Sequence, residues 1–404
     1  MPDCCDFWHI HNHSYFSQGD ALPFPPTMAN NAFDKNQNAI ALTDHGTMNG
    51  LIYLWLMVNE WNKDNLKASG FLPVMGCEFY TVKHEETYKD KETGREHLIV
   101  LARDWEGYKA MVKMSRYGYD HHHHRPLVSH DLLQEMSDAG ITEHLIATSA
   151  CPISSINKEL VWRGEDAAEN ELEWFKSIFP NFYIELMDHS IDSETYSHPE
   201  MENPLGDKDR NLALYEIAKR TGTPYVFSND SHYKDKEDAY AHDMYLSLTN
   251  RQKYSGHGYW IRTEDEMREA FEYFDDKMWR EGIDGLLEIR EKCSDFTSPT
   301  FFTEDDKVKW HLPEISDDDR KLRDLCIEGI DKRIEQGWLN PDNKQDHLDR
   351  IDEELDVIQG AGFSSYFLMV SEYVRWAKHE SPCSWFDCGK TEADHGMKII
   401  PILV

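Results

Sequence analysis

Side chains that could bind a metal recur at the ends of short β-rich runs in the first 232 residues. The segment HIHNHS places His11 and His13 two residues apart. Alternate residues of an extended segment project to the same side, so both imidazoles can bind one divalent ion. Two histidines at this spacing, with no further ligand, are also typical of surface residues on a strand. The pair therefore indicates a metal site only if other segments supply further ligands.

Other segments do supply candidates, each beside a predicted strand. Imidazole, carboxylate and thiolate are the ligand types that first-row divalent metals accept. Taken singly, Asp44 is as typical of a capped turn as of a residue that orients His45, and Cys151 is typical of a small buried hydrophobe. Because they recur at successive strands, we interpret them as one shared site. These candidates are Asp44, His45, Glu78, His97, Cys151, Asp230 and His232.

The elements that must position these residues are short strands alternating with helices, up to about Pro299. A helix is predicted over 209–220, stopping at Gly222 before Pro224. This alternation is typical of an α/β fold with a parallel sheet, and seven strands are enough to close a barrel. In a barrel of parallel strands the active-site residues lie at the edge where the strands end. The predicted strands are Phe7–Ile10, Ala39–Thr43, Leu72–Met75, Leu98–Leu101, Leu145–Ser149, Phe182–Leu186 and Tyr225–Ser228.

Beyond Pro299 the strand pattern ends and apolar stripes at helical spacing follow. The first stripe contains Leu322, Leu325, Ile330 and Ile334, and two more run over 348–358 and 363–377. Acidic clusters around Glu304 and Asp317 predict a linker, so we expect a domain boundary there.

Composition restricts the function classes. The chain has 404 residues and a formal net charge of −33, which argues against a protein that coats nucleic acid nonspecifically, because such binding depends on cationic side chains. A site that acts on phosphate would therefore have to be confined to one place and use cations other than Lys and Arg. The 21 histidines indicate that these cations are metal ions. The first residues do not form a secretory signal, no apolar run is long enough for a membrane span, and eight scattered cysteines predict reduced thiols. We therefore expect a cytoplasmic protein with no membrane partner.

The motifs together resemble the PHP (polymerase and histidinol phosphatase) domain. The similarity is to the form that opens the alpha subunit of bacterial replicative DNA polymerase III, and it runs to about Lys378. It implies a distorted seven-stranded (β/α)7 barrel over 1–298, a helical segment resembling the start of the polymerase palm over 299–380, and a divergent tail over 381–404. The matching segments are HIHNHSYFS, IALTDHGTMNG, PVMGCEFY, HLIVLARDWEGY, LIATSAC, FYIELMDH, PYVFSNDSHYKDKEDAYAHD and GFSSYFLMVSEYVRWAKH.

The resemblance also implies a centre of two or three divalent ions, with Zn, Mn or Mg as candidates. It adds Asp20 to the ligands, in a loop that reads QGDA where the family usually has LLDG. Within this set we expect Glu78 and Asp230 to act in catalysis as bridging carboxylates, and we include Asp44 as a catalytic residue beside His45. The implied metal ligands are His11, His13, Asp20, His45, Glu78, His97, Cys151, Asp230 and His232.

The function implied is that of a metal-dependent phosphoesterase in DNA replication, with the proofreading 3′→5′ exonuclease as the expected activity and a DNA 3′ end as substrate. The chain shows neither a Gly-Arg-Gly-Ser type of loop nor a following Asp-x-Asp strand, so we expect no polymerase activity from this polypeptide alone. Two alternatives remain. One is the N-terminal piece of a split polymerase that mainly assembles with a second polymerase chain or replisome subunits. The other is a small-molecule phosphatase of the histidinol-phosphate kind.

Three further groups have two interpretations each. Glu185 and His189 could line the pocket or simply end a strand. The tract His121–His124 could bind metal, but a solvated loop is our prediction. A loosely spaced set could form a small zinc site, although no paired CxxC supports it. That set is His379, Cys383, Cys388 and His395.

Overall fold

A computed structural model describes residues 5–64, 70–84, 96–196, 201, 204–296 and 315–379. It divides into two units, Met1–Pro299 and Thr300–Val404. The predicted tail over 381–404 and the loose cysteine and histidine set lie outside the described residues, apart from the backbone of His379.

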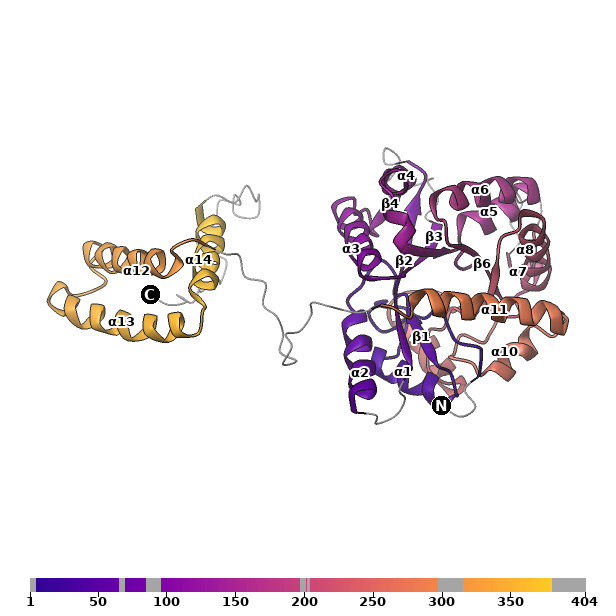
Figure 1. Ribbon diagram of the computed structural model, residues 1–404, viewed down its shortest axis with the longest axis horizontal. Helices are drawn as coiled ribbons and strands as arrows, with labels where there is room; N and C mark the ends of the chain where they lie inside the picture. The colour runs from indigo at the N-terminus through magenta and orange to yellow at the C-terminus, as the bar shows by residue number, and fades with distance from the viewer. Residues whose placement is uncertain are drawn as a thin grey trace. The chain divides into compact units, whose positions relative to one another are not determined.

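The first unit is built on a curled sheet of seven strands, with helices packed around its outside (Figure 1). The strand order is β1-β2-β3-β5-β6-β7, and β4 pairs with β2. The strands are β1 (Ala39–Leu42), β2 (Leu72–Val82), β3 (Glu96–Ala102), β4 (Leu127–Ser129), β5 (Leu145–Thr148), β6 (Phe182–Met187) and β7 (Tyr225–Ser228). The sequence therefore predicted the α/β class correctly and placed six of these strands.

Two features differ from the prediction. The sheet is mixed, because β3 runs antiparallel to both β2 and β5 while the other pairs are parallel. β2 and β3 are consecutive and adjacent, so the chain turns back between them and does not cross over the sheet. The segment Phe7–Ile10 is not a regular strand either. It makes only a single bridge, from His9 to Ile40, because the chain there must pass between two parts of the sheet.

The helices of the first unit begin and end at recognisable residues. Asp104 caps α3 by accepting a hydrogen bond from the Gly107 amide, and α8 ends at Gly222, which has a left-handed φ of 65°. The α-helices are α1 (Pro25–Asp34), α2 (Leu51–Asp64), α3 (Trp105–Asp120), α4 (His130–Asp138), α5 (Ser155–Arg163), α6 (Glu165–Ile178), α7 (Ser193–Tyr196), α8 (Asp207–Thr221), α9 (Ala239–Leu248), α10 (Glu264–Ala270) and α11 (Asp276–Cys293). Short 3₁₀ turns are η2 (Ile141–His144) and η3 (Lys236–Asp238).

One apolar core joins the sheet to these helices. All four residues of β1, β5 and β7 are buried, which explains their continuous apolar sequences. The first chain segment contributes Phe7, Trp8 and Ile10 to the same core. The fold therefore holds the backbone on both sides of His9 and His11 in packed surroundings.

The described part of the second unit is helical. It contains α12 (Asp318–Glu335), η4 (Pro341–Asn343), α13 (Lys344–Gly360) and α14 (Ser364–His379). Leu322, Cys326 and Leu355 form its small core. Leu325 was predicted on the buried stripe but is 47% exposed, because Cys326 occupies the inward position one residue later. No described helix of either unit combines the length and apolar character that crossing a lipid bilayer requires.

We expect Gly107→Ala to destabilise the first unit by about 1–3 kcal/mol, the usual cost of overpacking. A Cβ at Gly107 would overlap the main-chain oxygen of His144, so α3 could no longer lie against η2. Urea unfolding followed by circular dichroism would measure the change. Gly360→Ala is the control, since a Cβ there meets no atom within 4 Å. A loss of stability in the control as large as that in Gly107→Ala would contradict this account of the contact.

Candidate metal centre

The strands deliver polar side chains to one edge of the sheet. His45 follows β1, Glu78 lies within β2, and Cys151 follows β5. His97 instead lies at the beginning of β3, where it pairs with Tyr80. Because β3 is antiparallel, its beginning lies at the same edge as the ends of the parallel strands. The mixed sheet therefore explains why this one histidine precedes its strand.

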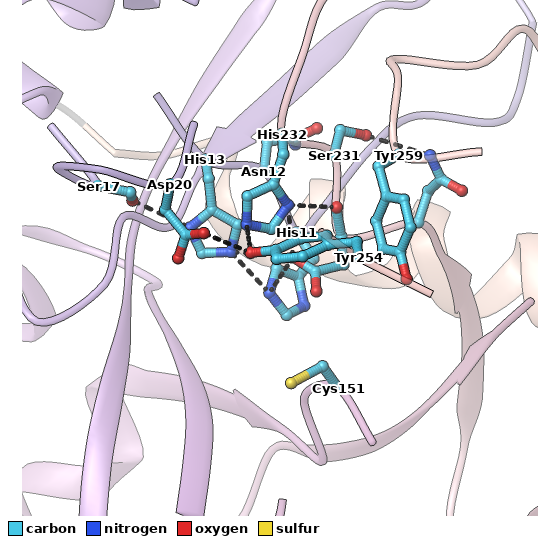
Figure 2. Close-up of polar contacts among 12 residues, drawn as sticks. His11, Asn12, His13, Ser17, Asp20, Cys151, Ser231, His232, Tyr254 and Tyr259 are labelled. Atoms are coloured by element: carbon cyan, nitrogen blue, oxygen red, sulfur yellow. Dashed lines mark hydrogen bonds and ion pairs between the residues drawn. The ribbon is translucent and has the colours of Figure 1, made fainter. Parts of the chain in front are cut away.

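The segment with His11 and His13 closes the sheet between β1 and the residues after β7. His9 bridges to Ile40 on one side, and Asn12 bridges to Ser231 on the other. The Asn12 side-chain amide donates to the main-chain oxygens of His9 and Ala41, at 3.1 and 2.9 Å. Figure 2 shows that the imidazoles gather around this segment. The backbone pairing on both sides fixes the direction of the two histidines.

Glu78 is the centre of the cluster. Its Oε1 lies 3.3 Å from His11 Nε2 and 2.9 Å from His97 Nδ1, and its Oε2 contacts His45 Nδ1. The side chain is 1% exposed, and neither oxygen makes a hydrogen bond of acceptable geometry. Burial alone would raise the pKa of Glu78, but the surrounding imidazoles hold it well below its usual range. The carboxylate is therefore charged and available as a ligand.

Asp230 supplies a second buried carboxylate to the same histidines. Its Oδ1 lies 3.0 Å from His13 Nε2 and 3.3 Å from His11 Nε2, and this oxygen also lacks a hydrogen bond. The residue has a left-handed φ of 46°, which aspartate tolerates better than most residues. Against the effect of burial, His11 and His232 hold the pKa of Asp230 well below its usual range. The turn after β7 therefore directs a charged oxygen at His11 and His13.

Hydrogen bonds behind the cluster hold three imidazoles with one nitrogen facing inward. His11 Nδ1 lies 3.1 Å from Glu185 Oε2, and His232 Nδ1 lies 2.8 Å from the Asp230 main-chain oxygen. Both partners can only accept, so each Nδ1 carries the proton. In the neutral form of each imidazole the lone pair is then on Nε2, which is the nitrogen that a metal ion would bind.

His13 is held in the same way through a serine. Its Nδ1 lies 3.2 Å from Ser17 Oγ, and Ser17 donates its own proton to Asp44 Oδ1 at 2.7 Å. Asp44 also accepts from the amide and the hydroxyl of Ser14. Asp44 therefore hydrogen-bonds to serines and reaches His13 through one of them. Of the two alternatives from the sequence, these contacts with the Ser14 amide and the two serine hydroxyls favour the capped turn over an Asp44 that orients His45.

Burial and neighbouring cations lower the pKa of His13 to about 3. The folded state therefore keeps His13 neutral at pH values where an exposed histidine is protonated. Burial also lowers the pKa of His11, but Asp230 and the two nearby glutamates outweigh it, and the pKa of His11 is raised well above its usual value.

Asp20 and two residues from the segment after α9 complete one side of the site. Asp20 Oδ2 lies 3.1 Å from His45 Nε2, and Asp20 Oδ1 accepts a hydrogen bond from Tyr254 at 2.6 Å. The Tyr254 hydroxyl also lies 3.0 Å from His232 Nε2, and Arg251 pairs with Asp20 at 2.5 Å. Sequence reasoning missed Arg251 and Tyr254, because the segment RQKY has no spacing that indicates chemistry.

Cys151 contributes the only sulfur of the predicted set. Its Sγ lies 3.2 Å from His97 Nδ1, and Figure 2 shows Cys151 on a chain segment separate from that of His11 and His13. Burial, Glu78 and Asp230 raise the pKa of Cys151 well above its usual value. The thiol therefore remains protonated next to these carboxylates, and a bound cation would be needed to stabilise its thiolate.

The structure places all nine predicted ligand positions at this one site. Seven of the nine residues form three overlapping groups, each with its donor atoms within 4.8 Å of one another, while Asp20 contacts His45 and Cys151 contacts His97. Buried nitrogen and oxygen atoms that converge in this way, with Glu78 and Asp230 Oδ1 lacking hydrogen bonds, fit a set of metal ligands. The groups are His13–His45–His232, His11–His13–Asp230 and His45–Glu78–His97.

The remaining candidates take supporting positions. Glu185 is buried behind His11, where Ser228 donates to its Oε2 at 2.5 Å. His189 borders the cavity above the centre, which has a volume of about 430 Å³ and includes Arg125 and Lys253 in its wall. The tract His121–His124 follows α3 and is not part of the three ligand groups.

Comparisons with known proteins agree with this geometry. The PHP domain profile matches residues 9–189, and the profile described as the bacterial DNA polymerase III alpha NTPase domain matches residues 320–384. The DNA polymerase III subunit alpha of Borreliella burgdorferi is 30% identical over 92% of this chain and 30% of the relative. That of Aquifex aeolicus is 28% identical over 92% of this chain and 31% of the relative. This chain thus spans about a third of the length of these relatives.

One solved structure shows a weak similarity. A crystal structure from Bifidobacterium adolescentis, described as that of a metal-dependent phosphoesterase, covers 67% of this chain and 96% of the other, with 14% identity and a TM-score of 0.35.

We expect Glu185→Gln to weaken metal binding by about 10- to 100-fold, the usual effect of changing a residue that orients a ligand. The amide cannot accept from His11, Thr148 and Ser228 as the carboxylate does. Competition with a chelating dye would measure the zinc affinity of the purified protein. Glu173→Gln is the control, because Glu173 is 54% exposed on α6. Unchanged affinity in Glu185→Gln would remove Glu185 from the centre.

Proposed function

The chain contains a PHP domain and resembles the N-terminal part of the bacterial DNA polymerase III alpha subunit, and from this we propose that it hydrolyses the 3′ ends of DNA as a metal-dependent 3′→5′ exonuclease. The observation that carries the proposal is the set of inward-facing lone pairs around Glu78 and Asp230. Imidazoles whose Nδ1 protons are already bound, next to charged carboxylates without hydrogen bonds, are prepared for divalent cations.

The nine predicted ligands would hold these ions, and Glu78 and Asp230 are the carboxylates that contact more than one imidazole. Divalent cations would supply charge to stabilise the phosphate oxygens and would lower the pKa of a bound water. Glu185, Ser17 and Asp44 keep His11 and His13 in the required tautomers. Tyr254 donates its hydroxyl proton to Asp20, so it holds that carboxylate beside His45 at the wall of the cavity.

The reaction proposed is hydrolysis of the last phosphodiester. A water oxygen forms a bond to phosphorus, the bond between phosphorus and the 3′ oxygen breaks, and that oxygen takes up a proton. The products are a nucleoside 5′-monophosphate and a chain shorter by one nucleotide. A cationic side chain at the cavity wall supports a phosphate substrate, since Arg125 borders the cavity, whereas Arg251 and Lys253 there are paired with Asp20 and Asp243.

A second role is favoured by a specific observation in the other unit. The helices α13 and α14, and α12 from its third residue, coincide with the match to the polymerase profile over residues 320–384. We propose that these helices associate with polymerase or other replisome subunits, and that the protein works in the cytoplasm with them. Copurification with such subunits would support the assembly role independently of hydrolysis.

We expect purified protein to release nucleoside monophosphates from a labelled primer with Mn²⁺ or Zn²⁺. His11→Ala and Asp230→Asn each remove a predicted metal ligand. Each should reduce the rate of release by more than about 100-fold, which exceeds the usual effect of changing a residue that only orients a ligand. A chelator should abolish release, and added metal should restore it. Asp276→Asn is the matched control, because Asp276 is fully exposed at the start of α11.

Two results would contradict the proposal in different ways. Release that is the same in Asp230→Asn as in wild type would place the activity elsewhere. Faster hydrolysis of p-nitrophenyl phosphate than of the primer, with the same dependence on His11, would assign the centre to small phosphate monoesters.

A further inference from the structure

A second groove adjoins the metal cavity on the side of α3. It has a volume of about 270 Å³, and its wall includes the end of α3 and the loop after it. Four residues border both the groove and the metal cavity, so the two spaces meet. These shared residues are His45, Tyr80, Arg125 and Arg251.

The charge of this groove differs from that of the rest of the molecule. The chain has 75 acidic residues, yet no carboxylate is among the residues that border the groove. Arg125 and Arg251 lie there together with His122 and His124. In the described part of the chain, Arg125 makes no ion pair, and its guanidinium lies 5.4 Å from the centre of the Tyr80 ring. A cationic lining in an otherwise acidic protein concentrates an anionic ligand at this place.

The groove also presents aromatic rings. Tyr119 is 54% exposed at the end of α3, and the His122 ring lies parallel to it at 6.3 Å. Phe16 and Tyr80 lie on the same lining. Exposed aromatic rings beside cations are the usual means by which proteins bind unpaired bases and the phosphates between them.

We propose that this groove binds the single-stranded nucleotides next to the one being removed, with Tyr119 and His122 against a base and Arg125 against a phosphate. The inference rests on the proposed hydrolysis of DNA ends and names the form of the substrate, which is an unpaired strand several nucleotides long. The tract His121–His124 thereby acquires a function. His124, with a left-handed φ of 62°, turns the chain so that His122, His124 and Arg125 all border the groove.

Binding is tested first, with a single-stranded phosphorothioate oligothymidine of ten residues and Mn²⁺ present, so that turnover does not interfere. We expect Tyr119→Ala to weaken binding by at least fivefold, the lower end of the loss usual for one stacked base. We expect Arg125→Gln to reduce the slope of log affinity against log salt by about 0.7, the value for one phosphate contact with a single strand. Fluorescence anisotropy would measure both.

Controls come from similar residues away from the groove. Tyr240 is 74% exposed and Arg163 has a side chain that is 69% exposed, and neither borders the groove or the metal cavity. Tyr240→Ala and Arg163→Gln should bind the oligonucleotide as wild type does. Losses in these controls equal to those in Tyr119→Ala and Arg125→Gln would overturn the groove as a specific site.

Hydrolysis then distinguishes the two proposals. We expect His122→Ala/His124→Ala to lower kcat/KM for the unmodified oligonucleotide at least fivefold relative to kcat/KM for bis(p-nitrophenyl) phosphate, which is too short to reach the groove. An unchanged ratio together with unchanged binding in Tyr119→Ala would overturn the groove. If wild type hydrolysed neither substrate, the proposed exonuclease would fail, whereas loss of binding in Tyr119→Ala would still establish the groove.

Discussion

The buried carboxylate of Glu78 is the constraint around which the first unit is organised. A carboxylate that is 1% exposed costs several kcal/mol unless positive charge compensates for it, and here the compensation comes from imidazoles on three other chain segments. Those segments must therefore meet at one point. Glu185, Ser17 and Asp44 then fix which nitrogen of His11 and His13 faces that point.

The topology of the sheet makes this meeting possible. Parallel strands alone would bring together only residues that follow strands, and His97 would lie at the wrong edge. Reversal of β3 brings the beginning of that strand to the edge where β1, β5 and β7 end. The bridges from His9 and Asn12 close the sheet at its other side. A small departure from a regular parallel barrel thus completes the ligand set.

The charge of the groove beside the metal centre differs from the charge of the protein as a whole. The net charge of −33 gives the molecule no general attraction for nucleic acid. Near the centre, however, the carboxylates are enclosed by imidazoles, and the adjoining groove has Arg125 and Arg251 but no acid. A phosphodiester therefore meets cationic side chains beside the metal site, although the protein as a whole is acidic. Such a distribution of charge favours binding of DNA at one place on the protein over nonspecific binding along the DNA.

The sequence by itself determined the α/β class, six of the seven strands and the chemical nature of the ligands, because apolar runs and residues such as His11 and Cys151 are local features. It also indicated that these residues form one site. It did not determine the reversal of β3, the position of Asp44 behind Ser17 or the exposure of Leu325, because each depends on which neighbour the chain meets. The sequence also did not show that Arg251 and Tyr254 belong to the site. They approach Asp20 from more than 200 residues away in sequence, and only the packing of the segment after α9 brings them there.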